Sequence, residues 1–275
     1  MAGIRGIVFA VLLPCVLPAA AQSARDLVRK AVQVELVASD NDHSHWLYFE
    51  IDRQPAKTVR QWVAETASAS LKRVVERNGQ PLSESQQRQE MSAFINDPHA
   101  QDRQRKSGQH DDDQAAELTK MLPDAFIWTR DGEQGNRIRL HFKPNPQFHP
   151  PDLESRVFAA MEGEMVIDRD QHRIMTLKGH LIHDVKIGYG LLGDLEAGGT
   201  FDVERRELSP KVWQITETHV HIQGHALIFK TISEQEDDVK THFQQLTAST
   251  SLQQAQNDLL HQNPNPLGDR ASEQR

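Results

Sequence analysis

The sequence predicts an α+β protein built on one large antiparallel sheet of about ten strands, with helices covering its apolar face. Three observations support this prediction. Between residues 156 and 231, apolar and polar residues alternate in successive runs, which is typical of strands with one buried and one solvated face. Short turn sequences separate the runs and favour antiparallel neighbours. Segments with helical spacing precede and follow them.

The centre of the predicted sheet is the segment of residues 173–187, which reads as one long strand. The apolar residues that share one parity in it are Met175, Leu177, Gly179, Leu181, Val185 and Ile187. A strand of this length exceeds the usual length of about five or six residues, so we expect a bend or bulge at Gly179. Residues 161–168 alternate in the same way, and the turn sequence after them predicts a hairpin. The strands that complete the meander are residues 195–203, 212–222 and 226–232.

The amino-terminal half contains a helix, two groups of strands and a polar helical insert. A capping box at Ser23 begins a helix over residues 23–37. The insert, residues 84–122, is a helical segment that Pro98 breaks and Pro123 ends. Runs of β-branched and aromatic residues predict strands at 46–51, 58–66, 70–76, 126–129 and 137–142.

The carboxy-terminal segment is predicted to hold one short helix and a disordered tail. Val239, Phe243 and Leu246 have helical spacing, which predicts a helix over residues 236–246. Residues 247–275 are rich in Gln, Asn, Ser and Pro, a composition typical of disorder. Residues 22–246 are therefore expected to form a single folded domain.

Residues 1–21 have the pattern of a cleaved secretory signal peptide. Arg5 precedes a short apolar run, and three alanines form a small-residue cleavage site before Gln22. Cys15 is the only cysteine, and because Pro14 precedes it, we do not expect lipidation. The mature chain has no second long apolar segment, so no transmembrane segment is expected. The sequence thus predicts an exported, periplasmic protein without disulfides.

The charge of the chain argues against two classes of partner. The formal net charge is −8, and removal of the signal peptide takes away one positive charge and leaves −9. An acidic chain is not expected to bind nucleic acid without specificity or to dock on anionic lipid by bulk charge.

The order of elements resembles that of the LolA-like superfamily of outer-membrane lipoprotein carriers and receptors. The similarity is strongest in four segments, 163–168 (GEMVID), 177–181 (LKGHL), 198–201 (GGTF) and 212–213 (VW). A closer resemblance, to uncharacterised exported bacterial proteins, rests on residues 75–83 (VERNGQPLS) and 225–230 (HALIFK). The resemblance implies a curved, unclosed antiparallel sheet, a half-barrel, with helices over its concave face. In the carriers this concave face holds acyl chains, and related members act as sensors of envelope components.

The apolar face of the predicted sheet supplies the candidate ligand-binding residues. They are Met161, Met165, Met175, Leu177, Leu181, Phe201, Val203, Leu227 and Phe229. Two interpretations stay open for them. They form an ordinary core under the helices, or they line a cavity, for which flexible methionine side chains are well suited.

No catalytic motif or cofactor signature stands out. His219 and His221 lie two apart on one predicted strand and are a weak candidate for a zinc site, although histidines on a solvated face are the more common case. Glu162 and Glu164 share a face, as carboxylate pairs in glycosidases do, but alternating carboxylates are common on sheets. We therefore expect no metal, no cofactor and no enzymatic activity.

Two functions are consistent with the sequence. The first is an exported, monomeric, non-enzymatic protein that binds an apolar small molecule or acyl chain, such as a lipid or an acylated peptide, in the concave face of the sheet. The second is an envelope interaction or sensor module without a bound ligand, in which the insert and the tail contact envelope proteins. The identity of the ligand is not specified by the sequence.

Overall fold

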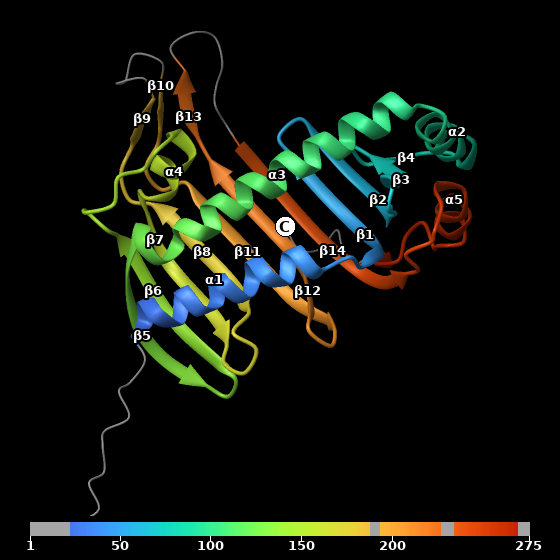
Figure 1. The fold of residues 1–275 in the computed structure, drawn as a ribbon. Helices are drawn as coiled ribbons and strands as arrows, with labels where there is room; N and C mark the ends of the chain where they lie inside the picture. The colour runs from blue at the N-terminus through green and yellow to red at the C-terminus, as the bar shows by residue number, and fades with distance from the viewer. Residues whose placement is uncertain (1–22, 188–192, 227–233, 269–275) are drawn as a thin grey trace, which may run out of the picture.

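The computed structural model describes residues 23–187, 193–226 and 234–268, so the predicted signal peptide lies outside the described residues. An eleven-stranded antiparallel sheet dominates the fold, with the strand order β4-β3-β2-β1-β14-β12-β11-β8-β7-β6-β5 (Figure 1). Because β4 and β5 are separate edges, the sheet is not closed. The predicted class, an α+β protein with a curved, unclosed antiparallel sheet, is confirmed. Its strands are β1 (His45–Gln54), β2 (Lys57–Glu65), β3 (Ser70–Arg77), β4 (Gln80–Pro81), β5 (Phe126–Gln134), β6 (Arg137–Pro144), β7 (Met161–Asp168), β8 (Ile174–Leu181), β11 (Thr200–Ser209), β12 (Val212–Ile222) and β14 (Glu234–Leu246).

Two long helices lie side by side across one face of this sheet, which we call the concave face (Figure 1). The described helices are α1 (Ala24–Asn41), α2 (Glu84–Ile95), α3 (Pro98–Ala125), α4 (Leu153–Phe158) and α5 (Leu252–Leu260). Helices α1 and α3 cover the concave face, whereas α2 and α5 pack at the β1–β3 end. A second, three-stranded sheet consists of β9 (Val185–Ile187), β10 (Gly193–Leu195) and β13 (Gly224–Ala226).

The main core lies between α1 and the β5–β8 half of the sheet. Ser23 caps α1, as predicted, because its hydroxyl accepts a hydrogen bond from the backbone N–H of Asp26 at 3.1 Å. The apolar stripe of α1 is fully buried against the strands and consists of Leu27, Val28, Ala31 and Val32. The same buried cluster contains Leu140, Met165 and Leu181 of the strands. Burial of this stripe holds the helix on the sheet.

A second core fills the other end of the sheet. Phe49 of β1 and Trp62 of β2 are buried there, together with Met91 of α2 and Leu259 of α5. The alternate residues of β1 point to the opposite face, where Trp46, Tyr48 and Val63 of β2 form a third, smaller cluster. Strand β1 is therefore buried on both faces, and two cores rather than one stabilise the molecule.

The predicted helix over residues 236–246 is wrong, because this segment is strand β14. It lies between β1 and β12 and pairs with both, Val239 with Ile51 for example. A bulge at His242, whose φ is 57°, interrupts the two-residue alternation. Phe243 then reaches the concave face, where its ring lies 5.3 Å from that of Tyr48. The bulge gives the apolar residues of this strand a spacing that imitates a helix.

The predicted disordered tail is also wrong over residues 252–260, which form helix α5. Ser251 and Gln254 make a capping box at its start. One apolar face, Leu252, Ala255 and Leu259, is buried against β2 and β3. The segment is further tied down by Arg73, which donates hydrogen bonds to the carbonyls of Leu259 and Gln262 at 2.6 and 2.9 Å. The polar residues that suggested disorder lie on the solvated side of an amphipathic helix, whose apolar side packs on the sheet.

The predicted single strand over residues 173–187 is two strands in different sheets. Strand β8 ends at Leu181, whose N–H and carbonyl bond to residues 199 and 198, and a bend at 182–184 leads into β9. Likewise, residues 195–203 are divided between β10 and β11. The bulge in β8 is at Met175 and not at Gly179, because Thr176 pairs with Val166 and Ile174 with Ile167. Of the predicted strand 226–232, only residue 226 is described.

The polar insert forms the two helices α2 and α3, with the break just before Pro98. Asp97 caps α3 by accepting a hydrogen bond from the N–H of Ala100 at 2.9 Å, and Pro98 occupies the first turn, where no N–H is needed. Pro123 does not end the helix, which continues to Ala125. Residues 105–115 of α3 are exposed on every side, so the helix crosses the concave face with no packing in its middle.

A candidate ligand cleft

A buried ion cluster joins α1 to the centre of the sheet. Glu35 points from α1 toward the strands, where its carboxylate accepts a hydrogen bond from Arg173 Nε at 3.1 Å and forms an ion pair with the same guanidinium group at 3.0 Å. The same carboxylate accepts a bond from the N–H of Ile174 at 2.7 Å and pairs with Arg205 of β11. Burial alone would raise the pKa of the Glu35 carboxyl, but the guanidinium groups of Arg205 and Arg173 hold the pKa below its ordinary value. Glu35 is therefore ionised and α1 is held in place.

The hairpin between β11 and β12 is attached to this cluster. Arg173 donates a hydrogen bond to the carbonyl of Lys211 at 3.2 Å, and its guanidinium lies 5.9 Å from the ring of Trp213. The indole N–H of Trp213 in turn donates to the side chain of Gln171 at 3.2 Å. Three segments that are distant in the sequence thus form one rigid floor.

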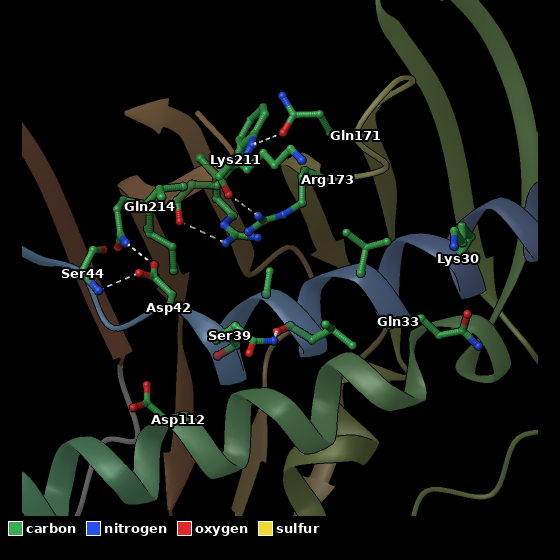
Figure 2. A pocket seen from close by; sticks show the side chains of 18 of the residues that line it. Lys30, Gln33, Ser39, Asp42, Ser44, Asp112, Gln171, Arg173, Lys211 and Gln214 are labelled. Atoms are coloured by element: carbon green, nitrogen blue, oxygen red, sulfur yellow. Dashed lines mark hydrogen bonds between the residues drawn. The ribbon is translucent and has the colours of Figure 1, made fainter. Parts of the chain in front are cut away.

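A cleft of about 1280 Å³ opens above this floor (Figure 2). It lies between the carboxy-terminal half of α1, the β11–β12 hairpin and α3, which contributes Asp112. The sheet itself opens at this place, since β12 pairs with β14 only through residues 217–222. Residues 212–216 of β12 therefore diverge from β14 and leave room beside the end of α1.

Apolar side chains from two elements line the cleft. They are Val34, Val37 and Ala38 of α1 and Val212 and Ile215 of β12. Val37 is 62% exposed and Ile215 is 43% exposed. Only four large apolar side chains are this exposed in the part of the chain that the structure describes, and two of them meet here. The cleft therefore presents an apolar surface that the protein does not cover itself.

The two ends of the cleft differ in their polar groups. At the end of α1, Asp42 accepts hydrogen bonds from the N–H of Ser44 at 2.9 Å and from Gln214 at 2.8 Å (Figure 2). Nearby, Glu65 accepts one from the N–H of Trp46 at 3.0 Å, and burial raises the pKa of the Glu65 carboxyl. At the hairpin end lie the cationic groups of Arg173, Arg205 and Lys211, together with the carboxylates of Asp170 and Glu207.

The candidate residues named from the sequence lie elsewhere. Met161, Met165 and Leu181 are buried in the core beneath α1, and Leu177 and Phe201 are partly buried against it. Met175 and Val203 are partly buried as well, and none of these seven lines the cleft. Leu227 and Phe229 lie outside the described residues. Gly179 serves the same core, since a Cβ there would come within 2.6 Å of the Phe201 ring.

The two histidines named as a weak metal candidate share a carboxylate. His219 and His221 lie 2.6 and 3.1 Å from the same oxygen of Asp237 on the neighbouring strand β14. Among the described residues, no group of three or more His, Cys, Asp and Glu side chains is arranged to hold a metal ion. Burial would raise the pKa of the Asp237 carboxyl, but the hydrogen bonds to His219 and His221 outweigh it and lower the pKa below its ordinary value.

Sequence reasoning missed the residues of the cleft for identifiable reasons. The predicted helix ended at Val37, four residues short of its observed end, so the sequence did not predict which elements lie next to this residue. Ile215 lies next to a bulge at Thr216, because Arg205 pairs with Ile215 and Glu204 with Glu217, and it lies just before the point where β12 begins to pair with β14. Glu35 is a charged residue within an apolar stripe, and this was the one signal in the sequence that pointed to a buried ion pair.

No described helix combines the length and the apolar character needed to cross a membrane. Comparison of the chain with protein-family models, with curated proteins and with solved structures gives no match.

Proposed function

We propose that this chain is an exported, non-enzymatic protein that binds an apolar ligand, a lipid or an acylated peptide, on the concave face of its sheet. The binding site is the cleft between α1 and β12. The observation that carries the proposal is the pair of exposed side chains, Val37 and Ile215, that face a cleft of about 1280 Å³. Burial of apolar surface contributes about 25 cal/mol per Å², so an acyl chain that covers this surface is stabilised there.

The rigid floor supports this proposal. Because Glu35 ties α1 to β8 and β11, the two apolar walls are held apart before any ligand arrives. A preformed site avoids the entropic cost of ordering on binding. The predicted signal peptide and the resemblance to the lipoprotein carriers place the protein, in this proposal, in the periplasm with acylated molecules in reach.

Direct binding to variants tests the proposal. We expect Ile215→Asp to weaken the binding of a fluorescent fatty acid by about tenfold or more, because a charge replaces apolar contact surface. Ile127→Asp is the matched control, since Ile127 is 41% exposed on the edge strand β5 and does not line the cleft. Native mass spectrometry and organic extraction of the periplasmic protein would identify the natural occupant. Equal binding by both variants would place the site elsewhere.

A second function, an envelope interaction or sensor module, is favoured by one observation. Residues 105–115 of α3 are exposed on every side and carry charges of both signs, which leaves a helix surface free for a partner. Under this alternative, reversing the charges of Arg103 and Lys106 abolishes capture of an envelope protein, and neither the wild type nor the variant binds fatty acid. Under the first function, the same variant binds fatty acid as the wild type does, and neither protein captures an envelope protein.

A further inference from the structure

The floor of the cleft carries an excess of positive charge at its hairpin end. Glu35 supplies one negative charge, and Arg173 and Arg205 supply two positive charges, so the buried cluster has a net charge of +1. Lys211, at the tip of the hairpin, adds another. Its carbonyl is held by Arg173, which fixes the backbone beside the cluster. The Glu207 carboxylate accepts a hydrogen bond from the backbone N–H of Lys211 at 2.7 Å and offsets one of these charges, so this end of the cleft keeps a net charge of +1.

The polar groups left without partners on the floor are donors. Arg205 Nε is buried and has no hydrogen-bond partner, and the Lys211 ammonium group has none among the residues that the structure describes. The buried Nε of Arg205 is out of reach of a molecule in the cleft, whereas the exposed ammonium group of Lys211 can donate to an anionic group that a bound molecule supplies.

The carboxylates of the cleft do not cancel this charge. Asp42 and Glu65 lie at the opposite end, where both are engaged by backbone N–H groups. Asp112 lies on α3 at the rim, and Asp170 lies in the β7–β8 turn, beside Arg169 at 3.5 Å. The cleft is thus positive at the β11–β12 hairpin and negative at the end of α1, with the apolar wall between the two.

We propose that the cleft selects anionic amphiphiles and binds their carboxylate or phosphate group at Lys211, beside the positive charge of the Arg173–Arg205 cluster. This inference rests on the proposed function and specifies its ligand class. The acyl chain lies along Val37 and Ile215, and the head group lies at the hairpin end, away from Asp42. A guanidinium and an ammonium group are suited to both carboxylate and phosphate, so fatty acids and lysophospholipids share the required chemistry.

Titration of the processed protein with amphiphiles of one chain length tests the inference. Palmitate and palmitoyl lysophosphatidic acid are expected to bind about tenfold tighter than hexadecanol, and hexadecyltrimethylammonium more weakly still. The preference should shrink as salt screens the charges. Comparing the two anions distinguishes a carboxylate source from a phosphate source. Inorganic phosphate, which lacks a chain, should not compete.

Two lysine variants provide the matched comparison. Lys211→Gln keeps the backbone carbonyl that Arg173 needs and is expected to remove most of the preference for palmitate over hexadecanol. Lys30→Gln removes a positive charge from the α1 wall, apart from Lys211 (Figure 2), and should change the preference by less than about twofold. If hexadecanol binds as tightly as palmitate, or if the two variants are equal, the charge inference fails while the proposed function stands. If no amphiphile binds, the proposed function itself fails.

Discussion

At the scale of single residues, Glu35 determines how α1 sits on the sheet. Its carboxylate is 8% exposed and receives two arginines and one backbone N–H. Replacement by Gln keeps the volume but leaves the buried guanidinium group of Arg173 and the partly buried one of Arg205 without a counter-charge, which we expect to lower the free energy of unfolding by about 3–5 kcal/mol. Urea unfolding measures this change. Glu117→Gln, which removes only an exposed pair with Lys120, should cost less than about 0.5 kcal/mol.

The contribution of Glu35 depends on pH in a defined direction. Its pKa in the folded protein lies below the ordinary value of 4.5, so the ionised group stabilises the fold above that pH. The stability is lost as the pH falls through the lowered folded pKa. We therefore expect the gap in unfolding free energy between wild type and Glu35→Gln to be constant near neutral pH and to narrow below pH 4.5. A gap that widened on acidification would contradict this assignment.

The ion cluster also shows that the sequence does not reveal which distant residues pair with Glu35. Arg173 and Arg205 lie 138 and 170 residues from Glu35 in the chain. The periodicity of α1 predicts that the position is on the buried face, but the identity of a counter-charge depends on which strands the helix crosses. Local pattern thus predicted helix α1 and its cap at Ser23 but could not predict the floor of the cleft.

At the scale of elements, α3 is a helix held only at its ends. Gly108 lies in its exposed middle, and a Cβ there would meet no atom within 4 Å. We expect Gly108→Ala to raise the free energy of unfolding by about 0.5–1 kcal/mol, because it removes backbone freedom from the unfolded chain at no steric cost. The melting temperature and urea midpoint report this change.

Gly163 is the matched control for that substitution. A Cβ on Gly163 in strand β7 would lie 1.9 Å from the carbonyl oxygen of Lys178, so Gly163→Ala must displace the backbone of β8 and should destabilise the protein. If Gly108→Ala does not stabilise the protein, the backbone entropy of α3 does not limit its stability. If Gly163→Ala stabilises the protein, the close approach of β7 to β8 tolerates a side chain.

The sequence predicted an element well where its own residues show a regular apolar pattern. It predicted an element poorly where contacts with neighbouring strands change that pattern. Strands β1, β2 and β3 alternate or carry aromatic residues along their whole length and were expected close to their observed bounds. Strand β14 needs a bulge at His242 to fit between two partners, and that bulge altered its apolar spacing. Helix α5 is polar on most of its surface, and its short apolar face is recognised only in the structure, where it packs on β2 and β3.

At the scale of the whole molecule, the sheet holds two cores at its two ends. One is built on α1 and β5–β8, the other on β1–β3 with α2 and α5. Strand β14 joins the two halves of the sheet, and α3 bridges them on the concave face (Figure 1). The ligand cleft lies between the halves, where β12 leaves β14. An arrangement of this kind allows one core to loosen while the other persists.

Removal of α5 tests whether the two cores are separable. A chain that ends at residue 249 lacks Leu252, Ala255 and Leu259, and the Arg73 guanidinium loses its carbonyl acceptors. Truncation is therefore expected to destabilise the β1–β3 end by several kcal/mol, through about 1.5–3 kcal/mol for each large apolar side chain that loses its burial. Amide hydrogen exchange should become faster in β2, β3 and α2 and stay slow in β6–β8. A chain that ends at residue 268 keeps α5 and should exchange like the full-length protein. Faster exchange across both halves would show instead that β14 makes the sheet a single cooperative unit, and the ligand cleft would then depend on α5 as much as on α1.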